Sequence, residues 1–157
     1  MNLVLTAIVA GLLGTLAMDV LNLLFAKLGL LEQIGHRMLG RVAHGWLRGR
    51  FFYSAPSEVP EVDNAMVYGF VTHYVIGVLL ALGYLVGWDL LTGDPASPIG
   101  AVIYGVGTTV FAYFYFFPGM GLGVCGRLSP LGIKLPITSL LNHGFYGLGV
   151  AAGIMLM

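Results

Sequence analysis

A run of apolar residues at 65–88 with a histidine inside it, His73, constrains this chain more than any other feature. The run has the ~20 residues that a helix needs to cross the hydrocarbon core of a bilayer. Similar runs cover residues 3–28, 99–117 and 137–157. Only 9% of the residues are charged, whereas soluble domains have about a quarter. We therefore expect an all-α polytopic membrane protein with four transmembrane helices.

The chain of 157 residues has the length of a single transmembrane domain, 1–157. Its one cysteine, Cys125, excludes an internal disulfide bond and a CxxC motif. The first residues lack the basic segment and the cleavage site of a signal peptide, so we expect the first run to be a retained span. The predicted partner is the lipid bilayer, and no nucleic acid is expected. The sequence leaves open a homo-oligomer, a larger membrane complex and the identity of any cofactor.

The charged residues predict the orientation of the chain. All seven Lys and Arg residues lie in or beside two of the three connections, 29–64 and 118–136. The remaining connection has none and carries Asp89 and Asp94. Because cytoplasmic loops are enriched in Lys and Arg, the two basic connections are expected in the cytoplasm. Four spans then place both termini on the periplasmic side of a bacterial inner membrane.

The first connection carries a short amphipathic pattern. At 100° per residue, one face is apolar and contains Ile34, Met38, Val42 and Trp46. The opposite face is basic. We expect a short interfacial helix on the membrane surface. The residues available to bind anionic lipid or an acidic partner are Arg37, Arg41, Arg48 and Arg50. A solvated basic face that only sets the topology is the alternative.

Each apolar run also carries a polar residue on its face of small side chains. These residues are Asp19, His73, Thr109 and His143. Counting at ~1.5 Å per residue puts all four in one layer, roughly 10–13 Å below the cytoplasmic surface. Ionisable side chains within a span usually face protein, water or a ligand. We therefore predict a polar centre at Asp19, His73 and His143. Its predicted supporting residues are Thr15, Asn22, Thr109, Tyr113 and Asn142.

Short similarities relate the two halves of the chain. Gly14-Thr15 matches Gly107-Thr108, and a His-x-x-x-Gly pattern occurs at 73–77 and again at 143–147. These matches suggest two parallel two-helix repeats. The glycine-rich loop 118–136 lies between the third and fourth apolar runs. We expect it to be re-entrant or tightly turned. A phosphate-binding loop is disfavoured, because that motif requires a preceding strand.

Three stretches resemble a family of uncharacterised bacterial inner-membrane proteins, DUF2938. They are Gly-Thr-Leu-Ala-Met-Asp at 14–19, Gly-Phe-Val-Thr-His-Tyr at 69–74, and Phe-Pro-Gly-Met-Gly-Leu-Gly at 117–123 followed by Asn-His-Gly-Phe-Tyr-Gly at 142–147. Gly49-Arg50-Phe51 resembles a loop motif of the family, although Tyr53 stands where that motif tends to have histidine. The resemblance covers most of the chain. It implies a four-span membrane protein and no established activity.

Three functions fit the predicted polar centre. Its side chains could hydrogen-bond across helices in a structural or accessory membrane subunit, which fixes helix register. An Asp and two His could form a proton relay in a proton or small-solute transporter or channel, which would need an oligomer because four spans make a thin pathway. Two imidazoles and a carboxylate could ligate zinc or non-haem iron.

An enzyme is disfavoured, and no catalytic residue is assigned. The intramembrane metalloprotease pattern of two histidines four residues apart on one helix is absent, and so is a G-x-S-x-G motif.

Overall fold

The computed structural model describes residues 2–33 and 35–157, and all regular structure within these residues is helical. The long helices are α1 (Leu3–Lys27), α3 (Ala65–Thr92) and α7 (Lys134–Met155). The shorter elements are α2 (His36–Trp46), η1 (Pro56–Glu58), α4 (Pro98–Gly107), α5 (Thr109–Phe111), η2 (Ala112–Phe116), α6 (Phe117–Gly119) and η3 (Val124–Gly126). The predicted all-α class is therefore confirmed.

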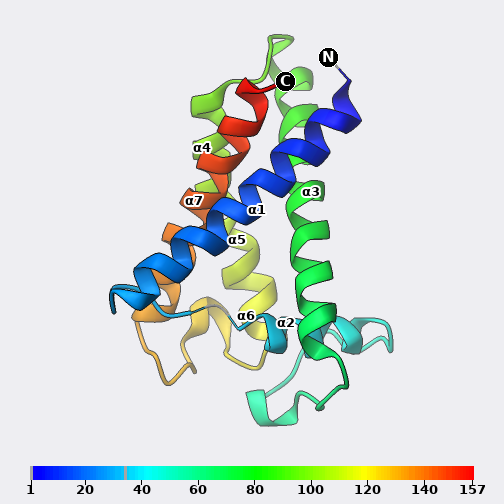
Figure 1. The fold of residues 1–157 in the computed structure, drawn as a ribbon. Coiled ribbons are helices and arrows are strands. Elements are labelled where there is room, and N and C mark those ends of the chain that lie inside the picture. Colours follow the sequence, from blue (N-terminus) through cyan, green and yellow to red (C-terminus); the bar gives the residue numbers. More distant parts are fainter. Residues whose placement is uncertain (1, 34) are drawn as a thin grey trace.

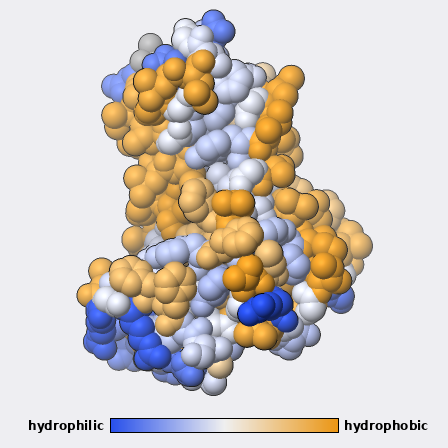
Figure 2. Space-filling view, turned by 180° about the vertical axis from the view of Figure 1, so that it is seen from behind, coloured by the Kyte–Doolittle hydropathy of each residue, from blue (hydrophilic) through white to orange (hydrophobic). Residues whose placement is uncertain are grey.

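Among the described residues, three helical segments are long and apolar enough to cross a membrane: α1, α3 and the stretch Pro98–Gly119, which contains α4, α5, η2 and α6. They indicate a membrane protein. The expected fourth span is not among them, although α7 has 22 residues. The reason is compositional, because Asn142, His143 and several glycines lower its hydropathy. On the face shown in Figure 2, strongly hydrophilic residues gather at the ends of the molecule, and apolar or weakly polar residues cover its middle.

Helix α1 organises the bundle. It crosses the molecule diagonally and packs against α7 and α3, while α4 packs against α7 (Figure 1). The start of α1, the end of α7 and the connection after α3 lie at one end; α2 and the other connections lie at the opposite end. Glycines allow this close packing. A Cβ atom on Gly149 would overlap the Leu13 carbonyl oxygen of α1, and one on Gly105 would lie 2.6 Å from Gly147 Cα of α7.

Helix α2 forms where the amphipathic pattern predicts it, but its apolar face is covered by protein. Val42 is fully buried and packs with Tyr53 and Val59, and Met38 and Trp46 pack against the same cluster. Ile34, which the pattern placed on this face, lies outside the described residues. Because the following loop covers this face, its buried residues are not available to insert into lipid. The position of α2 at the membrane surface stays a prediction.

The third apolar segment is interrupted, unlike the first. Thr108 separates α4 from α5, and Ala112–Phe116 form a π-helical turn. In contrast, α1 is one α-helix from Leu3 to Lys27. The matching halves suggested by the sequence are therefore not confirmed. Single π-helical turns within α-helices frequently occur at functional sites.

The glycine-rich loop is tightly turned and packs against the first connection. Gly121, Gly123 and Gly126 all have φ near +70°, between 72° and 74°. Glycine adopts this left-handed conformation without the steric penalty of a Cβ atom. A side chain at Gly121 would also overlap the backbone of Ala55, so the two connections meet there.

Candidate functional site

An aspartate and two histidines from three helices meet at one point. Oδ1 of Asp19, on α1, lies 3.1 Å from Nε2 of His73, on α3. The same oxygen lies 3.3 Å from Nε2 of His36, the first residue of α2. One ligand atom from each residue can be chosen so that all three lie within 4.8 Å of one another. We call these three residues the Asp-His cluster.

Two glycines on α3, one turn before and one turn after His73, bring the other helices to it. A Cβ atom on Gly69 would overlap the His36 carbonyl oxygen, so this glycine admits the start of α2. A Cβ atom on Gly77 would overlap Oγ1 of Thr15, which lies one turn before Asp19 on α1. The Gly-x-x-x-His-x-x-x-Gly sequence therefore builds the cluster by allowing two close helix contacts.

The imidazole of His36 is held by aromatic contacts. It stacks on the Phe70 ring, with centroids 4.3 Å apart and planes 14° apart, and meets the His73 ring edge-on at 5.0 Å. Its Nε2 atom is buried and lies within ion-pair distance of Asp19 Oδ1, at 3.3 Å. This atom makes no hydrogen bond among the described residues. Buried polar atoms without a partner are uncommon in native structures.

The spacing of the three groups suits a metal ion. Zinc binds imidazole nitrogen and carboxylate oxygen at about 2.0–2.2 Å, so neighbouring ligands of a tetrahedral ion lie about 3.3 Å apart. The two distances to Asp19 Oδ1, 3.1 and 3.3 Å, match this separation. The side chains are 15–17% exposed, so the cluster is less buried than the predicted centre.

His143 lies outside the cluster. Its Nδ1 atom pairs with Oγ1 of Thr108 at 2.7 Å. Thr109, the predicted partner residue of the third span, instead donates its hydroxyl to the Val106 carbonyl of its own helix. Adjacent residues of a helix point about 100° apart, so counting along the chain selected the wrong threonine. The predicted single centre is thus two sites, one at Asp19 and His73 and one at His143.

Three of the remaining supporting residues make hydrogen bonds to backbone carbonyls outside the cluster. Thr15 donates to the Gly11 carbonyl at 2.9 Å, and Asn22 donates to the Glu32 carbonyl at 3.0 Å. Tyr113 donates to the Pro136 carbonyl at 2.8 Å, which ties the π-helical turn to the start of α7. Asn142 differs from them. It is 0% exposed, and neither atom of its amide has a hydrogen-bond partner among the described residues.

A cavity of about 600 Å³ adjoins both sites. Its walls come from every long helix and from the turn at 112–116, and we call it the central cavity. His73 lines it from α3, while Asn142 and His143 line it from α7. Most of its other lining residues are apolar, including Met18, Leu39, Ile76, Leu80, Phe111, Phe116, Phe117, Met120 and Leu135. The central cavity therefore connects the surroundings of the cluster to those of His143.

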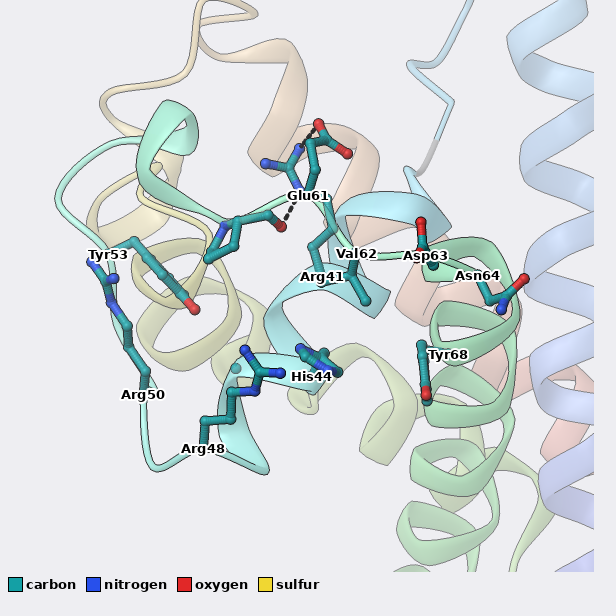
Figure 3. Close-up of a pocket in the computed structure, with 12 residues that line it drawn as sticks. Arg41, His44, Arg48, Arg50, Tyr53, Glu61, Val62, Asp63, Asn64 and Tyr68 are labelled. Carbon is teal, nitrogen blue, oxygen red and sulfur yellow. Dashed lines mark hydrogen bonds and ion pairs between the residues drawn. The ribbon is translucent and has the colours of Figure 1, made fainter.

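The basic residues of the first connection are mostly paired with acids. Arg37 and Arg41 lie 3.2 and 3.1 Å from Glu61 carboxylate oxygens, and Arg50 lies 3.5 Å from Glu58. Figure 3 shows Glu61 against Arg41 at the edge of a pocket of about 550 Å³, which Arg48 and Arg50 also line. Nearby carboxylates offset the charge available to an anionic partner, so this pocket is a weaker candidate than the Asp-His cluster.

His36 is the residue that sequence reasoning missed. It lies in the polar connection and belongs to no apolar run, so the count of depths along the spans did not include it. The residue type could have pointed to it: histidine is a common metal ligand, the chain has only four, and His36 starts the amphipathic segment. Its position beside Asp19 depends on the packing of α2 on α3, which no local pattern reports.

The fold and the cluster define a class: a helical protein with three candidate membrane spans and a two-histidine, one-carboxylate cluster beside an apolar cavity. The family follows from a profile match over residues 8–157 to DUF2938, a family described as proteins of unknown function. The chain belongs to this family, which confirms the resemblance seen in its motifs. No curated protein and no solved structure matches it.

Proposed function

We propose that this protein binds a divalent transition-metal ion at Asp19, His36 and His73. The observation that carries the proposal is the position of His36 Nε2, which is buried and without a hydrogen-bond partner among the described residues, yet lies 3.3 Å from Asp19 Oδ1. A cation between these atoms would satisfy both of them and His73 as well. Neutral imidazole and carboxylate are ordinary ligands of zinc, iron and manganese.

The donor set supports a site with an open coordination position. Three protein ligands leave room for water or a solute on a tetrahedral ion, as in catalytic zinc sites. Two histidines and one carboxylate also form the ligand set of non-haem iron proteins. Because His73 lines the central cavity, a molecule in that cavity would have access to the ion. The function that this supports best is metal binding that serves a solute, by transport or by chemistry.

We also infer a four-span arrangement in a bacterial inner membrane, with both termini periplasmic. Helix α7 supports it because α7 packs against both α1 and α4, and its C-terminal end lies beside the start of α1 (Figure 1). Its polar residue Asn142 is 0% exposed, so this amide would not face lipid in such a span. The bias of Lys and Arg toward two connections supports the orientation.

A second candidate function is supported by the direct contact of Asp19 and His73. Their 3.1 Å distance is also that of an ordinary hydrogen bond, which would fix α1 against α3 in an accessory subunit or carry a proton in an oligomeric transporter. Neither alternative requires His36. The contribution of His36 to metal binding therefore separates these functions from the first.

The test is metal binding by the purified full chain in lipid nanodiscs. We expect about one Co²⁺ ion per chain with the visible absorption spectrum of a low-coordinate site, displaced by Zn²⁺. The variants Asp19→Asn, His36→Ala and His73→Ala should each lose the spectrum. The other two histidines provide matched controls: His44→Ala and His143→Ala should keep it. Absence of bound cobalt in the wild type, or equal binding by all five variants, would refute the metal site.

A further inference from the structure

We propose that the central cavity binds an apolar alcohol, a single-chain or isoprenoid molecule whose hydroxyl group is held by Asn142 and His143. Asn142 and His143, adjacent residues of α7, both line the cavity, and the rest of its wall is mostly apolar. Both polar atoms of the Asn142 amide are buried without a hydrogen-bond partner among the described residues. The proposal does not depend on a metal at the Asp-His cluster.

Asn142 is the first observation. Its side chain is 0% exposed, and both Nδ2 and Oδ1 are buried without a hydrogen-bond partner among the described residues. Leaving such a group unpaired costs free energy, because its hydration is lost without a replacement, and an apolar residue of the same shape would avoid that penalty. The amide therefore destabilises the ligand-free fold. Because Asn142 lines the central cavity, a ligand in the cavity could supply the missing partners.

His143 is the second observation, and the threonine beside it fixes the tautomer. Thr108 Oγ1 lies 2.6 Å from the Gly105 carbonyl oxygen and 2.7 Å from His143 Nδ1. A hydroxyl has one hydrogen, and the carbonyl can only accept, so the hydroxyl donates to Gly105. The imidazole must then donate its Nδ1–H to Thr108. The neutral ring consequently carries its free lone pair on Nε2, which is able to accept a hydrogen bond.

The two groups together select the chemistry of the ligand. His143 Nε2 accepts a hydrogen bond, while the Asn142 amide offers two donor hydrogens and one acceptor. A hydroxyl group both donates and accepts, so one alcohol can donate its hydrogen to the ring nitrogen of His143 and accept a hydrogen bond from Nδ2 of Asn142. A carbonyl group can only accept and would leave the ring nitrogen unpaired. Anions are disfavoured, because neither residue supplies a positive charge.

The size and walls of the cavity define the apolar part of the ligand. Cavities of about 300–1,000 Å³ with mostly apolar walls and a few polar groups are typical of small-molecule sites. The central cavity has about 600 Å³, and its walls include Phe111, Phe116 and Phe117. This volume suits one aliphatic or isoprenoid chain. The source of the hydroxyl can be a free alcohol or the headgroup of a glyceride, and competition experiments separate them.

The test uses a photoactivatable hexadecanol with a diazirine in its chain, on the full protein in nanodiscs. We expect the hexadecanol probe to label residues of the central cavity. A hexadecane diazirine lacks the hydroxyl group, so it should label these residues at least about tenfold less. Unlabelled hexadecanol should compete, and hexadecane should not. Competition by a diacylglycerol as well would assign the hydroxyl to a lipid headgroup; competition by hexadecanol alone would assign it to a free alcohol. Either result supports the proposal.

The decisive variant is Asn142→Leu, which preserves shape and removes the amide. We expect hexadecanol labelling to fall about tenfold, while the Tm without ligand equals or exceeds that of the wild type. The matched control is Leu141→Ala, whose residue is 44% exposed on the same helix and should label normally. Equal labelling by hexadecane and hexadecanol, or full labelling of Asn142→Leu, would overturn the proposal. Cobalt binding by Asn142→Leu stays intact whether or not the cavity binds an alcohol, so the two proposals fail independently.

Discussion

The backbone carbonyl of His36 occupies the space where Gly69 would carry a Cβ atom. This contact joins α2 to α3 without intervening side chains. It places the imidazole of His36 over Phe70 and within reach of Asp19. We expect Gly69→Ala to push the start of α2 away, because the obstructing atoms belong to the backbone and cannot move alone. Cobalt affinity should fall at least about tenfold, as a small displacement of one ligand is enough to weaken a metal site.

The same helix offers a control for this substitution. Gly87 has no atom near the position of an added Cβ, so Gly87→Ala should retain cobalt binding. It should also stabilise α3 by about 0.5–1 kcal/mol, since alanine loses less conformational entropy in a helix. Titration with Co²⁺ and thermal unfolding in nanodiscs measure the two effects. Unchanged affinity in Gly69→Ala would show that the contact does not position His36.

A second pair of variants tests which contact allows α1 to approach α3 closely. In Gly77→Ala the new methyl group would overlap Oγ1 of Thr15, so we expect α1 to shift, Tm to fall and cobalt binding to weaken. The double variant Gly77→Ala, Thr15→Ala removes the overlapping oxygen and should recover part of both losses. Neighbouring residues that interact directly show coupling energies of about 0.5–3 kcal/mol in such cycles. If the losses of the two single variants simply add in the double variant, the new methyl group at position 77 conflicts with an atom other than Oγ1 of Thr15.

The hydroxyl of Tyr146 connects α7 to α3 and should matter for stability. It donates to the Gly77 carbonyl at 2.6 Å, and the residue is 2% exposed. Tyr146→Phe removes this bond while keeping the ring, so we expect a loss of about 0.5–2 kcal/mol in the free energy of unfolding. Tyr68→Phe, at a residue 42% exposed, should change stability little. Equal stability of Tyr146→Phe and the wild type would contradict a stabilising role.

The side of the membrane on which α7 ends tests the number of spans. With four spans, alkaline phosphatase fused to the C-terminus should be active and a fluorescent-protein fusion should be dark, because the C-terminus is then periplasmic. With three spans and the same N-terminus, the two signals would be exchanged. Fusions placed after Arg48 should report the cytoplasm in either case, since the first connection has the highest density of basic residues.

Much of the fold was predictable because its signals are local. The apolar runs predicted helices close to α1 and α3, and the alternation of Met38 and Val42 with basic residues predicted α2. The family was also recognisable from short motifs around Asp19 and His73. The π-helical turn and the break at Thr108 were not predictable, because they depend on how this segment packs against α7 and the glycine-rich loop.

The candidate site was predictable only in part. Asp19 and His73 were expected at one depth, and the structure places them in contact. The third residue is His36 and not His143, and the threonine that pairs with His143 is Thr108 and not Thr109. Each difference arises from rotation about a helix axis or from the docking of a separate helix. Counting residues measures depth along a helix, but it does not measure either of these.

The helical class, the apolar segments and the small-residue stripe around His73 can be read from the amino-acid sequence, because composition and periodicity act over a few neighbouring residues. Which polar groups meet depends instead on tertiary packing. Gly69 and Gly77 permit two close helix contacts, but these glycines do not determine which residues lie opposite them. The partners follow from burying α2 and α1 against α3, and long-range packing of this kind depends on the whole chain.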